Sequence, residues 1–495
     1  MKTMASAAAV SLVLWGVAGA QEVPAWRGYG ANAQHSAPAP APGQKLKALH
    51  WKTKIDLDPQ YSGGELLIHY GSPMITASNT ILLPVKTGAT GGFRIEAHDA
   101  TGAKLWQKKT DFVLAPHDWV PSFPAHLTAQ NRLYFAGAGG TVYFRDTPDL
   151  KTGAKAQLAF YGFAAYLQNK SIYDQKVMID TPITADEAGN IYFGFVVTGS
   201  NPANLKSGIA RIGADGTGSW VSAASAANDN EISQVAQNCA PAVSQDQSTI
   251  YITVSDGIAG YLVALDSATL VQKSTVRLKD PRNGADALLL DDSSAAPTIG
   301  PDGDVFYGVV ESDFGGHNGR GWLLHFSSDL ATTKTPGSFG WDNTVAVVPT
   351  SAVPSYSGTS PYLLMTKYNN YYGIGSGNGH NEIAILSPDE TQKDRFSNAT
   401  VMKEVMTREN PTQFPGAPPG VVYEWCINSA VVDAQGQAVI ANAEDGRTYR
   451  WDLARDKLQA FRLNPPRPEA YTPTIIGPDG TTYAINNAEF YALGE

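Results

Sequence analysis

A short turn pattern recurs along most of the chain, and it constrains the fold more than any other feature. An apolar strand is followed by a polar turn and by a second strand rich in β-branched and aromatic residues, as in Arg132 to Phe135 and Asn190 to Phe193. Such runs after Gly, Asn or Asp turns are typical of β-hairpins. Most successive turns are 52–59 residues apart, and the eight turns lie at residues 77–80, 129–132, 186–190, 245–247, 300–303, 356–358, 433–436 and 477–480.

Each unit also contains a third strand that ends in a second polar turn, for example at residues 95–102 and 261–269. Four strands in each unit predict an all-β fold, namely a β-propeller of four-stranded blades, because a ring of blades leaves few sheet edges free. The number of turns predicts eight blades, with seven as the competing count.

The two ends of the chain are predicted to meet in one blade. The last unit, from Tyr471 to Gly494, supplies only about three strands, and the run from Leu49 to Thr53 is similar to the segment that follows a third strand at Leu105. We therefore expect an N-terminal strand to complete the last blade, so that residues 48–495 form a single propeller domain. Residues 21–47 are predicted to be an extended, proline-rich arm, and residues 393–420 an inserted loop on one face.

The first twenty residues have the features of a signal peptide. Lys2 is followed by an apolar stretch from Ala5 to Val17 and by the small residues 18–20. We expect cleavage near Ala20 and a secreted or periplasmic protein, with no later stretch apolar enough to span a membrane. The net charge of -10 argues against nucleic acid as a partner. A monomer is expected.

One segment carries a family resemblance. The run from Ala97 to Trp106, Ala-His-Asp-Ala-Thr-Gly-Ala-Lys-Leu-Trp, resembles the Ala-x-Asp-x-x-Thr-Gly-x-x-x-Trp signature of pyrroloquinoline-quinone (PQQ)-like repeats, with one residue missing between Asp and Thr. A degraded copy occupies residues 264–269. The resemblance extends to the architecture of almost the whole mature chain and implies a fold similar to that of the quinoprotein alcohol dehydrogenases, which use PQQ and calcium. Those enzymes usually carry adjacent cysteines over the cofactor, whereas Cys239 and Cys426 are far apart here, and there is no haem motif.

The predicted functional face contains the loops that enter each innermost strand and those that join the second and third strands. These loops are rich in Trp, Tyr, His, Asn and carboxylates, which suit a small-molecule or carbohydrate ligand because stacking and hydrogen bonding act together. The tryptophans could instead pack between neighbouring blades. The candidate ligand-binding residues are Trp119, Asp180, Asp291, Asp292, Trp341, Asn343, His380, Trp425 and Asn428.

The glycine-rich loop from Asp313 to Arg320 is the most site-like single segment. His317 is a candidate acid or base, and Arg320 a candidate clamp for a carboxylate. Together with Tyr371 they form the catalytic set expected of a β-propeller polysaccharide lyase. Glu311 and Asp313, two residues apart, are candidate ligands of calcium, with solvated surface acids as the alternative.

Cys239 and Cys426 each precede a predicted innermost strand, where non-neighbouring blades approach the axis. An oxidising compartment permits a disulfide between them, and two buried thiols are the alternative.

The function that these features favour is an exported ligand-binding propeller with its site on the aromatic and polar face. A PQQ- and calcium-dependent dehydrogenase, a polysaccharide lyase and a scaffold for envelope proteins remain as alternatives. The cofactor is left open: the carboxylates would suit calcium but are also typical of a solvated surface, and the separated cysteines and the missing haem motif count against PQQ.

Overall fold

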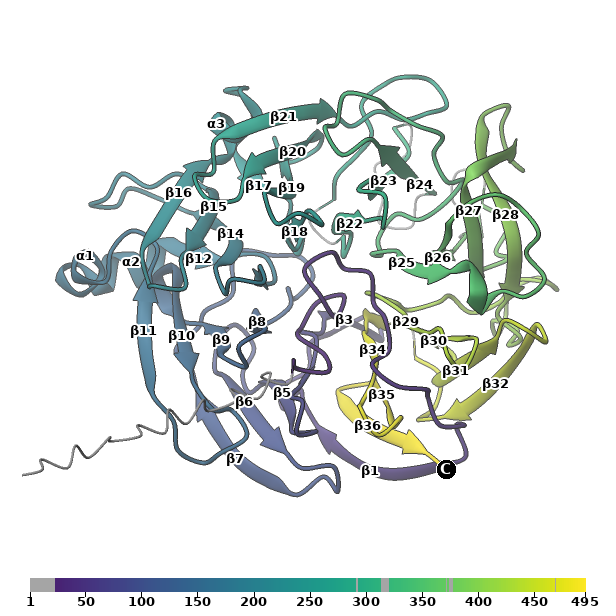
Figure 1. Cartoon of the computed structure of the whole chain (residues 1–495), viewed down its shortest axis with the longest axis horizontal. Coiled ribbons are helices and arrows are strands. Elements are labelled where there is room, and N and C mark those ends of the chain that lie inside the picture. The colour runs from purple at the N-terminus through teal and green to yellow at the C-terminus, as the bar shows by residue number, and fades with distance from the viewer. Residues whose placement is uncertain (1–22, 291–292, 313–319, 371, 374–376, 468) are drawn as a thin grey trace, which may run out of the picture.

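A computed structural model describes residues 23–290, 293–312, 320–370, 372–373, 377–467 and 469–495. Its strands form eight blades around one axis, which confirms the predicted β-propeller (Figure 1). The predicted signal peptide lies outside the described residues. No helix in the described part of the chain is long and apolar enough to cross a membrane.

The blades are numbered here in chain order. Blade 1 contains β4 (Met74–Ile75), β5 (Ile81–Lys86), β6 (Phe93–His98) and β7 (Lys104–Lys109). Blade 2 contains β8 (Ala125–Leu127), β9 (Leu133–Ala136), β10 (Thr141–Arg145) and β11 (Lys155–Ala159). Blade 3 contains β12 (Val177–Ile179), β13 (Thr184–Ala185), β14 (Ile191–Val197), β15 (Gly208–Ile212) and β16 (Gly218–Ser222). Blade 4 contains β17 (Gln234–Val235), β18 (Ala242–Val243), β19 (Thr249–Ser255), β20 (Gly260–Asp266) and β21 (Gln272–Arg277).

Blades 5 to 8 complete the ring. Blade 5 contains β22 (Thr298–Ile299), β23 (Val305–Val310) and β24 (Gly321–Phe326), extended outward by bridges from β24 to Gly337 and Thr333. Blade 6 contains β25 (Ala346–Pro349), β26 (Tyr362–Tyr368), β27 (Glu382–Lys393) and β28 (Thr400–Glu409). Blade 7 contains β29 (Val431–Asp433), β30 (Ala438–Ala443), β31 (Arg447–Asp452) and β32 (Lys457–Arg462). Blade 8 contains β34 (Thr474–Ile476), β35 (Thr482–Asn486), β36 (Glu489–Gly494) and β1 (Ala48–Lys54).

A few elements lie outside the blades. β2 (Tyr61–Ser62), β3 (Glu65–His69) and β33 (Glu469–Tyr471) form a separate small sheet. The helices are α1 (Phe163–Gln168), α2 (Lys170–Lys176), α3 (Ala223–Ala227) and the 3-10 turns η1 (Ala138–Gly140) and η2 (Thr350–Ala352).

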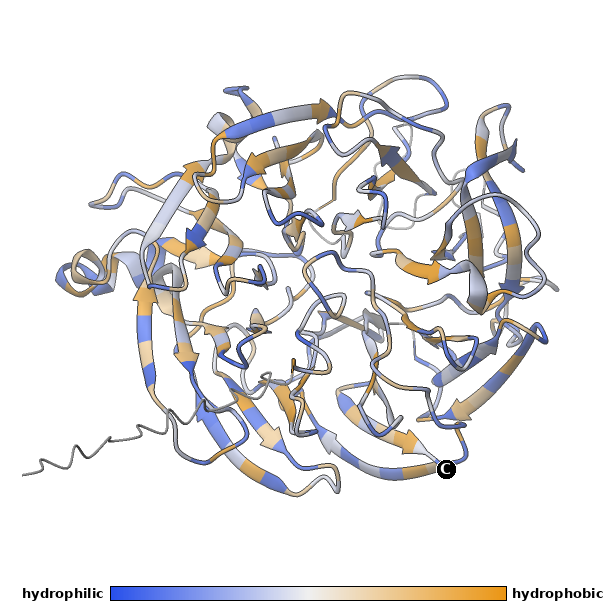
Figure 2. Ribbon diagram, viewed as in Figure 1, coloured by the Kyte–Doolittle hydropathy of each residue, from blue (hydrophilic) through white to orange (hydrophobic). Residues whose placement is uncertain are grey.

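The burial of the strands follows their distance from the axis. The second strands, such as β5 and β23, are buried along their whole length, whereas β1 and β32 alternate between exposed and half-buried residues. Figure 2 shows this alternation of hydrophilic and hydrophobic residues along the outer strands. Proline occurs in or just before several innermost strands, which tolerate it because a strand at a sheet edge has one side without ladder bonds. These prolines are Pro73, Pro124, Pro182, Pro241, Pro297 and Pro473.

The ring closes as the sequence predicts. β1 pairs antiparallel with β36, from Ala48 opposite Gly494 to Lys54 opposite Glu489. The Lys52 ammonium lies 2.8 Å from the Glu489 carboxylate. N-terminal and C-terminal residues therefore share blade 8.

Residues 23–46, the N-terminal arm, lie across the centre of the ring (Figure 1). The prediction of an extended arm did not include this burial: Trp26, Ala33, His35 and Ala37 are 0% exposed. The arm contacts the innermost strand, or the turn after it, in every blade. The atom pairs are Trp26 N with Ile75 O, Leu127 N with Arg27 O, His35 Nε2 with Thr184 Oγ1, Val243 N with Ala33 O, Ile299 N with Gln34 O, Val347 N with Ser36 O, Val432 N with Ala37 O and Gln44 N with Gly480 O.

The predicted inserted loop at residues 393–420 is in part regular structure. Residues 400–409 form β28, which pairs with β27 as the outer strand of blade 6. This outer strand was not predicted because the turn pattern around it is weak. The irregular segment that remains is residues 410–420.

Two truncations separate closure of the ring from packing of the arm. Deletion of residues 21–56 removes the arm and β1, so we expect aggregation through the open edge of β36. Deletion of residues 21–42 keeps β1, so we expect a monomer that melts at lower temperature than the full chain. Light scattering after size-exclusion chromatography and thermal melts measure both. A monomeric 21–56 deletion with unchanged melting would contradict the closure argument.

The arm also makes stability depend on pH. His35 is fully buried and donates through Nδ1 to the Pro297 carbonyl (2.7 Å), and burial lowers its pKa to about 4. The unfolded chain takes up this proton below about pH 6.5. The neutral His35 ring therefore makes its full contribution to the free energy of unfolding above about pH 6.5, and this contribution is lost as the pH falls towards 4.

Between about pH 7.5 and pH 5, we expect the free energy of unfolding to fall by about 2 kcal/mol less in the variant His35→Asn than in the wild type. Asn keeps a donor for the Pro297 carbonyl but does not titrate. Denaturant unfolding at both pH values measures the difference, and the exposed His50→Asn serves as the control. Equal pH dependence of the His35→Asn variant and the wild type would show that this ring is not responsible.

Candidate functional site

The loops that enter the innermost strands interlock around the axis, at the end of these strands away from their contacts with the arm. Hydrogen bonds join loops of different blades, some of them non-neighbouring. They connect Tyr70 N to Tyr471 O (3.0 Å), Asn428 Nδ2 to Tyr70 O (3.2 Å), Thr344 N to Asn428 O (2.9 Å), Ser294 N to Asp342 Oδ1 (2.9 Å), Asn238 N to Asp180 O (3.0 Å) and Ser122 N to Asn238 Oδ1 (3.0 Å). We call this rim of loops the axial mouth.

The small sheet brings aromatic rings together at the axial mouth. β3 pairs in parallel with β33, and His69 N donates to the Val120 carbonyl (2.8 Å). As a result, the rings of His69 and Tyr471 stack with centroids 4.7 Å apart, and the half-buried Trp119 lies 6.4 Å from Tyr471. His69 and Tyr471 are themselves 1% and 5% exposed, so the half-buried indole of Trp119 is the ring of this group that can receive the apolar face of a ligand.

A buried ion pair lies beside these rings. Lys367, near the end of β26, places Nζ 3.3 Å from Asp342 Oδ2 and 4.7 Å from the centroid of Tyr471. The two charged side chains are 3% and 0% exposed. Because loss of one partner leaves a buried charge uncompensated, the pair fixes the Asp342 loop against β26 within blade 6.

Two glutamates face each other next to this ion pair. Glu444 N donates to the Glu424 carbonyl (3.1 Å), so the two residues are neighbours across adjacent segments of blade 7. Burial, and then the charge of Glu444, raise the pKa of Glu424 well above its usual range, while Lys367 opposes the shift. Glu424 therefore keeps its proton to higher pH than an ordinary glutamate and can donate a hydrogen bond.

Several buried amide atoms in these loops have no hydrogen-bond partner within the described residues. They are Gln237 Oε1, Asn238 Nδ2, Asn343 Nδ2 and Asn428 Oδ1, on side chains whose residues are at most 5% exposed. A buried polar atom without a partner costs roughly 1–3 kcal/mol. Four such atoms in three neighbouring sets of loops indicate a place where a ligand or ordered water supplies the missing partners.

The predicted ligand-binding residues do not all lie at the axial mouth. Trp119, Asn343 and Asn428 belong to the axial mouth, as does Asp180, whose Oδ1 accepts from Gln237 Nε2 (2.9 Å). His380 lies away from it and pairs with Glu409 (3.1 Å). Asp291 and Asp292 lie outside the described residues.

Trp341 and Trp425 are packing residues rather than open stacking platforms. They are 4% and 1% exposed. Trp425 donates through Nε1 to the Asn381 carbonyl (3.2 Å) and packs edge-on against Tyr449. Trp341 packs closely against Gly321: a Cβ atom added to Gly321 would lie only 2.3 Å from the Cβ atom of Trp341.

The predicted catalytic set does not assemble within the described residues, because His317 and Tyr371 lie outside them. Arg320 is buried, and its guanidinium pairs with Asp394 (2.7 Å) and lies 4.6 Å from the ring of Trp322. This cation therefore already has a carboxylate partner, and its role as a ligand clamp stays a prediction.

The predicted metal ligands also do not form a site within the described residues. Glu311 is 4% exposed and lies 3.2 Å from Arg282 and 3.6 Å from Arg320, so its charge is compensated by arginines rather than kept for calcium. Asp313 lies outside the described residues. Among the residues that the structure describes, no three His, Cys, Asp or Glu side chains gather as a metal site.

The two cysteines are separate buried thiols rather than a disulfide. Cys239 precedes β18 in blade 4 and Cys426 precedes β29 in blade 7, so they lie on different sides of the ring. Burial raises the pKa of Cys239 to about 11, which keeps its thiol protonated.

Sequence reasoning missed Lys367 and Glu424. Lys367 stands in the run Tyr362 to Tyr368, which is otherwise mostly apolar, and this isolated charge in a buried strand was the available signal. Glu424 gave none, because its neighbour Glu444 is 20 residues away in the sequence.

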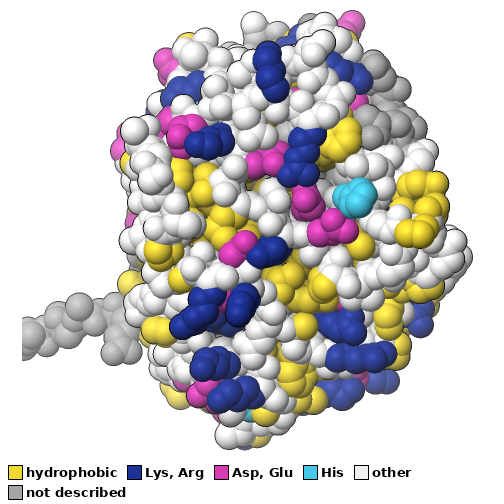
Figure 3. Space-filling view, turned by 90° about the vertical axis from the view of Figure 1, so that its right-hand side faces the viewer, with side chains coloured by type: hydrophobic (Ala, Val, Ile, Leu, Met, Phe, Trp, Pro, Cys, Tyr) yellow, Lys and Arg dark blue, Asp and Glu magenta, His cyan; other side chains and the backbone are white. Residues whose placement is uncertain are grey.

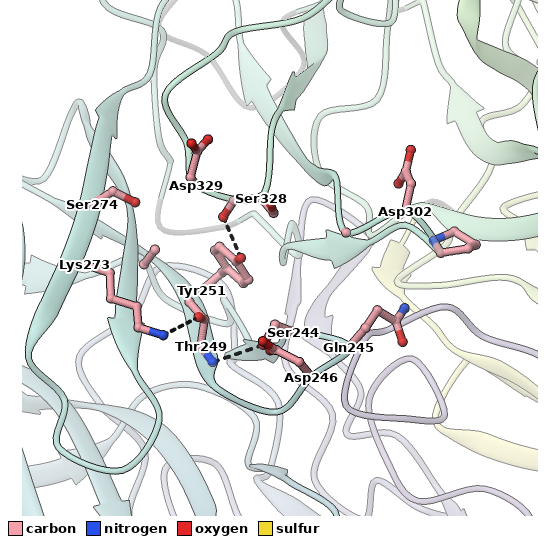
Figure 4. A pocket seen from close by; sticks show the side chains of 13 residues that line it. Ser244, Gln245, Asp246, Thr249, Tyr251, Lys273, Ser274, Asp302, Ser328 and Asp329 are labelled. Atoms are coloured by element: carbon pink, nitrogen blue, oxygen red, sulfur yellow. Dashed lines mark hydrogen bonds between the residues drawn. The ribbon is translucent and has the colours of Figure 1, made fainter.

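An open groove of about 450 Å³ lies between blades 4 and 5, away from the axial mouth (Figure 4). Its polar side chains already bond to one another or to nearby backbone. Lys273 Nζ donates to Thr249 Oγ1 (2.9 Å), and Tyr251 donates to the Ser328 carbonyl (2.7 Å). The groove therefore makes a weaker case for a ligand than the axial mouth.

No family model and no curated protein matches this sequence. Solved structures, in contrast, match this chain in fold. Quinohemoprotein alcohol dehydrogenase from Comamonas testosteroni matches with a TM-score of 0.57 at 10% identity, over 97% of this chain and 82% of that one. A europium-containing methanol dehydrogenase matches with a TM-score of 0.54 at 10% identity, over 93% and 89%. Quinohemoprotein alcohol dehydrogenase ADHIIG from Pseudomonas putida HK5 matches with a TM-score of 0.51 at 11% identity, over 95% and 76%. The chain has the PQQ-like eight-bladed propeller fold.

The residues of this PQQ-like propeller do not fit PQQ well. A flat quinone needs an open aromatic platform, and the two tryptophans nominated for that role, Trp341 and Trp425, are enclosed by packing. Glu311, nominated for calcium, is held by arginines. In the described axial mouth, His69 and Tyr471 stack on each other and are likewise buried, and the ammonium of Lys367 lies 4.7 Å from the Tyr471 ring, so the half-buried Trp119 is the accessible ring there.

This disagreement predicts a negative result. We expect the purified protein, supplied with PQQ and calcium, to reduce a redox dye with simple alcohols or aldoses no faster than a blank. A spectrophotometric dye assay measures this. Calcium-dependent dye reduction that disappears in Trp341→Phe or Trp425→Phe would contradict it and favour the dehydrogenase.

Proposed function

We propose that this chain is an exported, monomeric ligand-binding propeller, and that its ligand is a small neutral or cationic molecule, such as a sugar or polyol, held at the axial mouth. The observation that carries the proposal is the set of unpartnered buried amide atoms, including Asn343 Nδ2 and Asn428 Oδ1, beside the aromatic group of His69, Tyr471 and Trp119. Amides supply directional hydrogen bonds and rings supply stacking, which is the combination that sugar recognition uses.

The charge at the axial mouth supports this choice of ligand. Asp342 and Lys367 compensate each other, and Glu424 keeps its proton to higher pH than an ordinary glutamate, so this group of described residues leaves no cation for an anionic ligand. A uronate polymer therefore finds no charge there to pair with. The lyase alternative is therefore less well supported than a neutral ligand, and its assigned arginine is bound to Asp394. The likeness of the fold to dehydrogenases favours the PQQ alternative, which the dye assay tests.

The binding test uses a panel of sugars and polyols, with isothermal titration and tryptophan fluorescence as readouts. We expect at least one compound to bind and to perturb the Trp119 signal, with affinity reduced roughly tenfold or more in Tyr471→Leu. Tyr261→Leu, on a strand of blade 4 away from the axis, is the matched control. Binding that is unchanged in Tyr471→Leu would place the ligand elsewhere.

A stability measurement tests the role of the amides without any ligand. Asn343 Nδ2 has no partner in the described residues, and its Oδ1 receives only a 3.3 Å bond from Thr366, whose hydroxyl also reaches the Lys367 carbonyl. We therefore expect Asn343→Leu to leave the free energy of unfolding unchanged or raised by about 1 kcal/mol, and to weaken ligand binding.

Asn201→Leu is the matched control for this measurement. Asn201 Oδ1 accepts from Leu205 N (2.9 Å) and Nδ2 donates to the Leu205 carbonyl (3.1 Å), so its loss should cost about 1–3 kcal/mol. Denaturant unfolding of both variants gives the comparison. Destabilisation of Asn343→Leu to the same extent would show that its amide has a structural role.

A further inference from the structure

A second pocket, of about 170 Å³, lies between blades 1 and 2, far from the axial mouth in the ring. Its lining contains three cationic side chains, Lys108, Arg145 and Lys155, and three aromatic rings, Phe135, Tyr143 and Phe144, with no carboxylate. The formal net charge of the chain is -10, so a concentration of unneutralised cations is unexpected.

Arg145 is the central feature of this pocket. The residue is 7% exposed, and its guanidinium lies 4.2 Å from the ring of Trp106 and donates to the Leu150 carbonyl. Its Nε has no partner in the described residues, and none of their carboxylates forms an ion pair with it. Burial lowers the pKa of Arg145, and no neighbouring acid counters that effect. A buried guanidinium without an anion is costly.

The neighbouring cations add to that cost. Arg145 and Lys155 stand directly opposite each other on β10 and β11, an arrangement that is unfavourable for like charges. Lys108 approaches from blade 1, with Nζ 5.9 Å from the ring of Tyr143. Nearby acids are already used: Asp111 accepts from Tyr143 and lies 3.6 Å from Lys170, and Asp146 pairs with Arg132.

The outer wall of the opposite side of the ring provides a contrast. There basic and acidic side chains lie interspersed (Figure 3). Several arginines on blades 6 and 7 have carboxylate partners, as in the pairs Arg408–Asp456, Arg395–Glu404 and Arg455–Asp452. The pocket between blades 1 and 2 is thus built differently from the paired surface elsewhere.

We propose that this pocket binds a small organic anion. Its carboxylate or phosphate group would pair with Arg145, Lys155 and Lys108, and its apolar body would lie against the stacked rings of Phe135 and Tyr143, whose centroids are 5.5 Å apart. The volume exceeds that of a single ion, because a water molecule needs only about 10–15 Å³ on this measure. The site is independent of the ligand proposed for the axial mouth.

Isothermal titration of the full chain with four probes tests the proposal. Benzoate and phenyl phosphate carry an anion on a ring, inorganic phosphate carries the anion alone, and benzylamine carries a cation on a ring. We expect benzoate or phenyl phosphate to bind at least about fivefold more tightly than inorganic phosphate. Any binding of benzylamine would belong to the axial mouth and should be unchanged in variants of this pocket. The better of the two ring compounds identifies the anionic group. Binding should weaken as salt is raised.

The variants locate the site. Lys155→Gln and Lys108→Gln are each expected to weaken binding about fivefold, and Arg145→Gln to abolish it, with a thermal melt to confirm folding. Lys457→Gln, which removes the same charge from the outer strand of blade 7, is the control and should bind like the wild type. Three outcomes would overturn the proposal: no anion bound at about 10 mM, benzylamine binding that weakens in the lysine variants as benzoate binding does, or both lysine variants binding benzoate no more weakly than the control.

Discussion

Pairing of the innermost strands determines much of this structure. A propeller blade has two edges, and the inner edges of all eight blades converge on the axis, where backbone groups need partners. The N-terminal arm supplies many of them. Its backbone bonds to innermost strands of blades 1, 2, 4, 5, 6 and 7, and it reaches blade 3 through His35 and blade 8 through Gln44. A segment of about two dozen residues therefore ties together blades that do not touch one another.

Occupation of one end of the axis by the arm affects the rest of the ring. The loops at the other end of the inner strands bond to one another and to the arm, as where Tyr29 donates to the Ser294 carbonyl. Bonds such as Ser122 N to Asn238 Oδ1 join blades 2 and 4 across the intervening blade. This interlocking leaves amide atoms such as Asn343 Nδ2 buried without partners. The same constraint that closes the ring thus produces the polar, partly unsatisfied surface to which we assign the ligand.

The sequence was most informative where structure depends on local signals. Turn residues and alternating strands are local, so the blades and the pairing of β1 with β36 could be predicted from the hairpin repeat and the deficit of one strand in the last unit. The course of the arm is non-local: the proline-rich composition of residues 21–47 indicates an extended chain but not where it lies. For the same reason, the pairing of Arg320 with Asp394, 74 residues away, could not be predicted. Trp119 and Trp425 were both candidate ligand-binding residues, yet of the two only Trp119 is half-buried, whereas Trp425 is 1% exposed.

Charge then separates the two proposed sites. At the axial mouth, Asp342 pairs the ammonium of Lys367, and burial together with Glu444 raises the pKa of Glu424 well above its usual range. Between blades 1 and 2, the lining cations have no carboxylate among them, and burial lowers the pKa of Arg145. The axial mouth is therefore suited to hydrogen bonds with a neutral ligand, whereas the pocket between blades 1 and 2 has cationic side chains with which an anion can pair.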